Sequence, residues 1–235
     1  MICLSFDTDH LDEVRMREFL AAVPVPGDGT FFCTQPYDCL GEPHELCPHP
    51  FLGEAQGWAA ELQAKRKELP DAVGWRSHTC IYSHLIAQDV AASGYLYAST
   101  QYQPVAATRP FREVWGLWHM PIYYMDNLDF SHGRFWPEVD HVAFAPEVID
   151  TALADDGIYV FDFHPVHLLL NSVSAEAYLA RRDAFLAGES VEELRCDGRG
   201  ARTFYDELCA RMKETGSPSV RMRDALASWI DAEES

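Results

Sequence analysis

The chain has 235 residues, of which 48% are hydrophobic and 23% are charged, values typical of a soluble globular protein with a well-buried core. Its formal net charge of −19 at pH 7 argues against a nucleic-acid-binding surface and against docking on anionic lipid, because both require a basic footprint. No run approaches the ~20 apolar residues of a membrane span, and the start of the chain has no signal-peptide pattern, so we expect a cytoplasmic protein without a membrane span.

Short apolar runs alternate with longer amphipathic stretches, a pattern typical of β/α units around a largely parallel sheet. The predicted elements, in chain order, are a strand at 2–6, a helix at 11–23, strands at 30–34 and 44–47, a helix at 55–68, a strand at 72–75, a helix at 85–93, a strand at 95–98, an apolar run at 117–125, a helix at 146–154 and a strand at 158–163. After Ser174 the pattern is helical and charged. Because no repeat or linker interrupts the chain, we predict a single domain over residues 1–235.

Seven cysteines are present, an odd number without a CxxC pair, which argues against a disulfide framework. Buried free thiols are the favoured interpretation. The alternative is a thiolate metal site formed by four of them, Cys33, Cys39, Cys47 and Cys80.

Polar residues stand where the predicted strands end. They are Asp7 and Asp9 after the first strand, His49 after the third, Arg76 and His78 after the fourth, Asp126 after the aromatic run, and His164 at the end of the last strand. Because the carboxyl ends of parallel strands build the active sites of β/α folds, we expect these side chains to converge.

Asp7 and Asp9 are two residues apart, so on a strand both carboxylates can enter one pocket. Two close carboxylates repel each other, which makes a cation beside them natural, with one Asp as a metal ligand and the other as a base. The alternative is helix capping, since Asp9 or Asp12 precedes an amphipathic helix. Capping leaves Asp7 unexplained.

His49 stands between Pro48 and Pro50, which hold it in an extended loop that suits a metal ligand but is also common in ordinary loops. His78 lies in a polar turn after a strand and allows the same two interpretations. Arg76 could pair with an acidic residue, and a lone arginine at a strand end is most often a simple ion pair.

The segment 162–167 indicates a functional histidine more clearly than the other segments do. Strand alternation puts Asp162 and His164 on one face, where a carboxylate two residues before a histidine can orient the ring and hold it protonated. The alternative is a histidine that only caps a buried strand. The histidines at 10, 44, 84, 119, 132 and 141 are interpreted as surface or loop residues.

Carboxylate and imidazole donors without thiolates suit zinc or another divalent transition metal. An open metal site polarises a carbonyl and lowers the pKa of bound water to about 7. Together with a carboxylate base and a histidine acid, such a site can hydrolyse an amide or an ester.

The chain resembles the polysaccharide deacetylase family (carbohydrate esterase family four) from residue 4 to about residue 205, and most of all a divergent branch associated with bacterial O-antigen and capsule gene clusters. Seven segments in order carry the resemblance: SFDTDH at 5–10, TFFCT at 30–34, ELCPHPFL at 45–52, VGWRSHT at 73–79, MPIYYMDN at 120–127, VFDFHPVHLLLN at 160–171 and GRGARTFYDEL at 198–208. The resemblance implies an α/β fold, the distorted, incomplete (β/α) barrel of that family.

The resemblance also implies roles for single residues. Asp7 corresponds to the general base and Asp9 to a metal ligand. His49 corresponds to the metal-binding histidine, Arg76 to the arginine that orients the base, and His164 to the acid. The implied mechanism is attack of a metal-bound water, activated by the base, on an acetamido carbonyl, after which the histidine protonates the departing amine.

One departure from the family pattern concerns the metal. The family has two metal-binding histidines four residues apart, but the residue four past His49 is Gly53. We therefore expect the third ligand to come from elsewhere, with His78 as first choice and His84 as second. The expected cofactor is a divalent metal, with zinc preferred.

The leading functional hypothesis is a hydrolase that removes an N-acetyl or formyl group from a small-molecule or lipid-linked amino sugar during cell-surface glycan (lipopolysaccharide) biosynthesis. The first alternative is a catalytically inactive carbohydrate-binding protein on the same fold. The second is a hydrolase of a non-sugar amide. The aromatic residues between 115 and 136 could stack on sugar rings, although core packing is the favoured interpretation for most of them.

Overall fold

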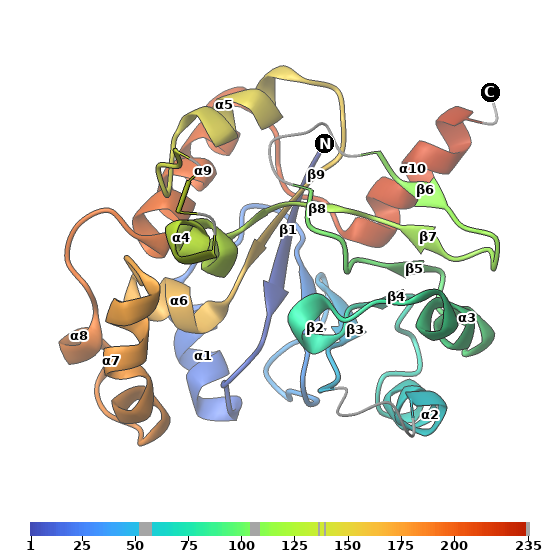
Figure 1. Ribbon diagram of the computed structural model, residues 1–235, viewed down its shortest axis with the longest axis horizontal. Helices are drawn as coiled ribbons and strands as arrows, with labels where there is room; N and C mark the ends of the chain where they lie inside the picture. The colour runs from blue at the N-terminus through green and yellow to red at the C-terminus, as the bar shows by residue number, and fades with distance from the viewer. Residues whose placement is uncertain (52–57, 104–108, 136, 139, 234–235) are drawn as a thin grey trace.

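A five-stranded parallel sheet forms the centre of the molecule. In the computed structural model, which describes residues 1–51, 58–103, 109–135, 137–138 and 140–233, the sheet has the strand order β3-β2-β1-β9-β8 (Figure 1). The strands are β1 Ile2–Asp7, β2 Thr30–Cys33, β3 Glu45–Pro48, β8 Ile122–Met125 and β9 Tyr159–Phe163. All of their pairings are parallel, as the alternation of strands and helices in the sequence predicts.

A smaller sheet of four short strands has the order β4-β5-β7-β6, made of β4 Gly74–Trp75, β5 Tyr97–Ala98, β6 Phe111–Arg112 and β7 Trp118–His119. It contacts the main sheet at the two edge strands of that sheet, β3 and β8. The Arg76 N–H donates to the Pro48 carbonyl (3.3 Å) beyond β4, and a parallel bridge joins Tyr102 to Ile122 of β8. The two sheets together make an open, incomplete barrel, which confirms the predicted fold.

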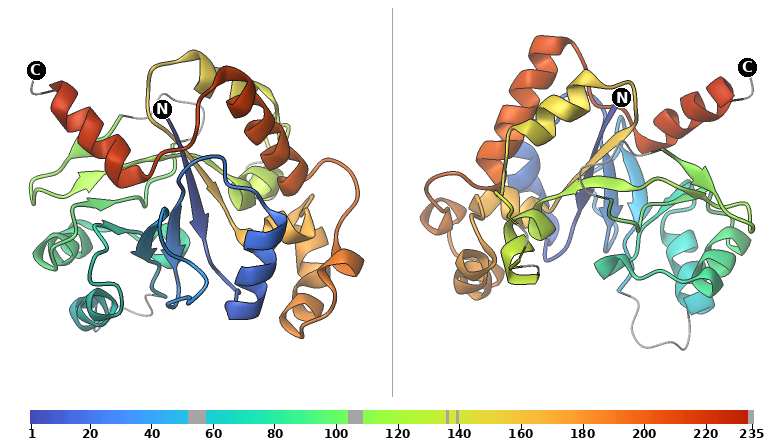
Figure 2. Two further views of the ribbon diagram at one scale, coloured as in Figure 1. Left: turned by 180° about the vertical axis from the view of Figure 1, so that it is seen from behind. Right: turned by 45° about the horizontal axis from the view of Figure 1, so that its top comes forward.

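Helices surround the two sheets (Figure 2). They are α1 Glu13–Ala22, α2 Trp58–Glu68, the 3₁₀ helix η1 His78–Cys80, α3 His84–Ala92, α4 Asp126–Phe135, α5 Glu147–Ala154, α6 Pro165–Leu170, α7 Ala175–Leu186, α8 Val191–Leu194, α9 Ala201–Thr215 and α10 Met222–Glu233. The largest core cluster lies between the main sheet and α1, α5, α6 and α9, whereas α2 and α3 pack against β4 and β5. Within the described ranges, every helix is too short or too polar to cross a membrane.

Residue alternation along β1 decides which side chains face the barrel interior. Ile2, Leu4 and Phe6 belong to the largest core cluster beneath the helices. Cys3 belongs to a different cluster, and the Ser5 hydroxyl donates to Asp162 of β9 (2.6 Å). Burying each large apolar side chain stabilises the fold by roughly 1.5–3 kcal/mol, so the register is strongly fixed. The apolar face therefore forces Ser5 and Asp7 toward the interior.

Several sequence predictions need correction. The apolar run at 117–125 is two strands, β7 and β8, which belong to different sheets and are separated by Met120 and Pro121. Helices α4 and α6 were not predicted, although Pro165 at the start of α6 is a favourable first helical residue. The predicted helix at 55–68 is α2, and its residues 55–57 lie outside the described residues. The interpretation of His119 as a surface or loop residue is wrong, because it lies in β7 and is 1% exposed.

Candidate metal and hydrolytic site

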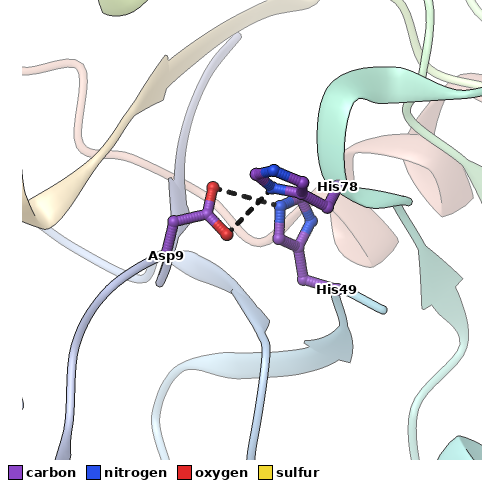
Figure 3. A group of neighbouring side chains, drawn as sticks. All are labelled: Asp9, His49 and His78. Carbon is purple, nitrogen blue, oxygen red and sulfur yellow. Dashed lines mark ion pairs between the residues drawn. The ribbon is translucent and has the colours of Figure 1, made fainter. Parts of the chain in front are cut away.

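Three side chains from three loops at the carboxyl edge of the barrel converge on one point (Figure 3). Asp9 Oδ2 is 3.5 Å from His49 Nε2, and Asp9 Oδ1 is 3.1 Å from His78 Nδ1. One donor atom from each residue lies within 4.8 Å of the other two. Asp9 and His49 are buried and His78 is partly exposed, so the group faces outward on one side only.

Local structure explains why each of these side chains is free for this role. Asp12, rather than Asp9, caps α1 by accepting from the Arg15 N–H (2.8 Å), which resolves the two alternatives left by the sequence. The His49 N–H donates to the Cys33 carbonyl (2.7 Å) and holds the proline-flanked loop beside β2. The ring of His78 packs on Phe51, with 4.3 Å between ring centroids.

The donor atoms of these three residues lack hydrogen-bond partners in the described ranges, as is expected of metal ligands. His49 Nδ1 lies 3.1 Å from the Arg76 carbonyl oxygen, which can only accept, so Nδ1 carries a proton and Nε2 faces the carboxylates of Asp7 and Asp9. Asp9 Oδ1, His49 Nε2 and His78 Nδ1 are buried and have no hydrogen-bond partner in the described part of the chain. A buried lone pair that faces carboxylate oxygens is costly unless a proton or a cation lies between them, so the residues fit a divalent metal.

The charges of neighbouring side chains shift the pKa values of Asp9 and His49. Burial raises the pKa of Asp9, but the neighbouring His49 and His78 lower it by more, so the net pKa lies well below its usual range. Burial lowers the pKa of His49, but the carboxylates of Asp7 and Asp9 raise it by more. Asp9 is therefore an anion in the folded protein at neutral pH, as a ligand to a cation must be.

The predicted second choice for the third ligand, His84, is wrong. Its side chain is 83% exposed at the start of α3, and its ring lies near Glu113 rather than near Asp9. His78, the first choice, lies beside Asp9 instead. Gly53, where the family pattern has its second histidine, lies outside the described residues.

Arg76 joins the two sheets at the base of the site. Its Nη1 donates to Asp7 Oδ1 (2.7 Å) and to Asp162 Oδ1, its Nε donates to the Ser99 carbonyl (2.7 Å), and its guanidinium carbon lies 3.9 Å from the centroid of the Phe32 ring. The side chain is fully buried. Burial lowers its pKa, but the two carboxylates raise it by more, so the guanidinium stays charged. This network fixes one oxygen of Asp7 and leaves Oδ2, 3.6 Å from His49 Nε2, at the site.

His164 is oriented by Asp126, not by Asp162. His164 Nδ1 donates to Asp126 Oδ1 (2.8 Å), and the His164 N–H donates to Asp126 Oδ2 (2.9 Å). The prediction that Asp162 orients this ring is therefore wrong. Asp162 accepts from Ser5 and Arg76, and burial raises its pKa despite the nearby arginine. The sequence did place Asp126 at a strand end, but it gave no sign of which strand end adjoins His164.

The Asp126 carboxylate keeps His164 charged. Burial lowers the pKa of His164, but the ion pair with Asp126 raises it by more, to about 10. With Nδ1 committed to Asp126, the second ring nitrogen lies 3.7 Å from Asp9 Oδ2 at the site. His164 is therefore a cationic donor beside the proposed metal ligands.

A cavity of about 320 Å³ opens onto these groups. Asp7, Asp9, His78 and His164 line its polar wall. The other wall is largely apolar and is formed by Met125, Leu128, Val166 and Tyr178. Its volume lies at the lower end of the range for small-molecule sites, which is roughly 300–1,000 Å³.

The remaining sequence predictions around the site have clear outcomes. All seven cysteines are free, as the favoured interpretation expected, and the candidate metal groups of the described residues contain none of them. Tyr123 and Tyr124 belong to the main core cluster. Trp115 is 45% exposed and is not among the residues that line the cavity, and Trp136 lies outside the described residues.

Comparisons with known proteins agree with this geometry. The chain is similar to a solved Bordetella bronchiseptica structure, described as a candidate polysaccharide deacetylase involved in O-antigen biosynthesis, with 23% identity, a TM-score of 0.72, and coverage of 89% of this chain and 90% of that one. It is also similar to a candidate polysaccharide deacetylase from Mycobacterium smegmatis, with 17% identity, a TM-score of 0.55, and coverage of 99% and 90%. At these identities the two structures establish the fold. No curated protein matches. Residues 4–182, well over half of the sequence, match the WbmS-like polysaccharide deacetylase family, and the chain belongs to that family.

Proposed function

We propose that this protein is a metal-dependent amidohydrolase that removes an acetyl or formyl group from the nitrogen of an amino sugar used in cell-surface glycan assembly. The observation that carries the proposal is that three functional groups lie together beside one cavity: the Asp9, His49 and His78 donors, the arginine-bound Asp7, and His164 paired with Asp126. Membership of a deacetylase family supports the reaction. The description of the Bordetella protein supports the glycan context.

Asp9, His49 and His78 would hold the cation, and their oxygen and nitrogen donors favour zinc. When bound, a cation of this kind polarises a carbonyl and lowers the pKa of water. Three protein donors leave a coordination position for substrate, which is the pattern of catalytic rather than structural zinc sites.

Asp7 is the proposed general base. Arg76 holds its Oδ1, so the free Oδ2 can accept a proton from water as that water attacks the acyl carbon. The same arginine places a cation directly beside the buried Asp7 carboxyl group.

His164 is the proposed general acid. Its protonated ring faces the cavity with one nitrogen fixed by Asp126, so it can deliver the proton of its other nitrogen to the leaving amine as the C–N bond breaks. The products are a carboxylate, acetate or formate, and a free amino sugar. Asp126 stabilises the imidazolium before the transfer. Afterwards Asp7 releases to solvent the proton that it took from water, and the His164 ring takes up a proton from solvent, which restores both groups.

Metal analysis of the purified protein tests the first part of this proposal. We expect near-stoichiometric zinc at the Asp9 site, lost in both His49→Ala and His78→Ala and retained in His10→Asn. His10 lines the same cavity but is not one of the three donors, and asparagine tolerates its positive φ of 63°. Equal metal content in all four proteins would remove this donor set from consideration.

Acetate release from N-acetylated amino sugars, free or nucleotide-linked, tests the second part. We expect release by the zinc-loaded protein and none by His49→Ala. Release only from simple non-sugar amides would keep the chemistry but change the substrate class. Sugar binding without any hydrolysis would indicate a carbohydrate-binding protein.

A further inference from the structure

A second cluster of metal-binding side chains lies outside the site described above, between the segment that precedes α3 and the β6–β7 hairpin. It consists of Tyr82, His84, Glu113 and His119, and we refer to it as the Glu113 cluster. Glu113 Oε2 is its centre: it accepts from the Tyr82 hydroxyl (2.7 Å) and lies 3.4 Å from His119 Nε2 and 3.9 Å from His84 Nδ1. None of these residues lines the cavity at Asp9.

The backbone around this cluster is fixed. The Glu113 N–H donates to the Leu117 carbonyl (3.0 Å), and the Gly116 N–H donates to the Glu113 carbonyl (2.9 Å) at a φ of +87°, so a tight turn holds Glu113 in place. His119 pairs with Phe111 across the two strands, and their rings are stacked at 4.8 Å. His84 differs from the others because it lies at the start of α3 with 83% of its side chain exposed.

The polar atoms of the cluster are poorly satisfied. His119 is 1% exposed, and neither of its ring nitrogens has a hydrogen-bond partner in the described ranges of the chain. Glu113 Oε1 is also buried without a partner. Each buried polar atom without a hydrogen-bond partner costs roughly 1–3 kcal/mol. Three such atoms in one place indicate that the cluster binds a group that interacts with them.

The charge and chemistry of the cluster favour a cation as that group. The Glu113 side chain is only 9% exposed, and its nearest polar neighbours are a tyrosine hydroxyl and two imidazoles. A carboxylate beside two imidazoles is a set of oxygen and nitrogen donors that divalent transition metals bind.

We propose that the Glu113 cluster is a second binding site for a divalent transition cation of the zinc class, held by Glu113, His119 and His84. Adjacent donors around a tetrahedral zinc ion lie about 3.3 Å apart, given bond lengths near 2.0–2.2 Å. The 3.4 Å between His119 Nε2 and Glu113 Oε2 already fits this spacing. The exposed His84 ring, 3.9 Å from Glu113 Oε2, would have to turn toward His119 to complete the set.

The position of the cluster suggests what the cation would do. Tyr82 and His84 lie just after η1, which begins with His78, whereas Glu113 and His119 belong to the β6–β7 hairpin. A cation here would tie the segment that carries the third donor of the Asp9 site to the second sheet. The proposed role is structural, and it does not depend on the hydrolytic function proposed above.

Zinc counting in matched variants tests this proposal. After equilibration with zinc, we expect two ions per chain in the wild type, one in His49→Ala, one in His84→Ala and none in the double variant. Leu85→Ala is the control, because Leu85 is the next residue, is 73% exposed and carries no donor. His84 is exposed, so its replacement should not disturb folding.

Thermal unfolding in the His49→Ala background isolates the second site. Zinc should raise the Tm of this variant, and the rise should disappear on adding His84→Ala or Glu113→Gln but persist on adding Leu85→Ala. A zinc count and a Tm response that are unchanged by both His84→Ala and Glu113→Gln would overturn the proposal. Failure of the Asp9 site alone would instead give one ion per chain that His49→Ala does not remove.

Discussion

Replacement of Arg76 with leucine is expected to lower the free energy of unfolding by about 3–5 kcal/mol, because it breaks a buried ion pair and leaves uncompensated charge. Arg76 is fully buried and contacts two carboxylates, Asp7 and Asp162, that are themselves buried. The proposed hydrolase activity should be lost as well, since the base would lose the hydrogen bond that positions its carboxylate. Urea unfolding at pH 7 and acetate release measure the two effects.

The loss of stability in Arg76→Leu is expected to grow as pH rises. In Arg76→Leu, buried Asp162 loses the cation that opposes the effect of burial, so its pKa in the folded state rises further above the unfolded value of about 3.9. The folded variant then binds more protons than the unfolded chain, and its stability falls as pH rises. The deficit relative to wild type should therefore be smallest near pH 4 and grow toward neutral pH.

Two further variants separate this explanation from a general loss of packing. Arg15→Leu removes another buried arginine, but its partner Glu18 is 45% exposed and is not stranded, so a smaller and pH-independent loss is expected. Adding Asp162→Asn to Arg76→Leu removes one of the two buried charges and should restore part of the stability. An equal deficit at pH 4 and pH 7, with no restoration by Asp162→Asn, would contradict the charge argument.

The parts of the fold that could be predicted from sequence are those fixed by a repeating pattern. Ile2, Leu4 and Phe6 pack against helices while Ser5 and Asp7 face inward, because alternation along a strand and burial of one face leave no other register. The convergence of strand-end polar residues follows from the parallel sheet. For this reason Asp9, His49, Arg76 and His164 could be named as neighbours before the structure was known.

The parts that could not be predicted depend on contacts between distant segments. Asp162 is two residues from His164 and was the obvious partner for its ring, but the same alternation points it at Ser5 and Arg76. Asp126, 38 residues away, takes that role because β8 lies next to β9. His119 was assigned to the surface because neighbours in sequence do not reveal that β7 is covered by Phe111 and Tyr82.

Replacement of His164 with glutamine is expected to lower kcat by ~10²–10⁴-fold with little change in KM, because it removes the proposed proton donor and keeps a polar side chain in the cavity. Zinc content should be unchanged, since His164 is not one of the three proposed ligands. His167→Gln is the matched control. His167 lines the same cavity, but burial lowers its pKa to about 4, so it is neutral and cannot deliver a proton at pH 7.

The pH profile distinguishes an acid from a residue that only shapes the cavity. In the wild type the pKa of His164 is about 10, so the acid form should persist to alkaline pH and the rate should fall only as the ring deprotonates. Asp126→Asn removes the carboxylate that raises this pKa, so the alkaline limb of kcat should move to lower pH. In His167→Gln the alkaline limb of kcat should not move, even if KM changes. Two results would contradict this role: an alkaline limb that does not move in Asp126→Asn, or a kcat of His164→Gln within about 10-fold of wild type. In either case the proton for the leaving amine would have to come from another group or from water.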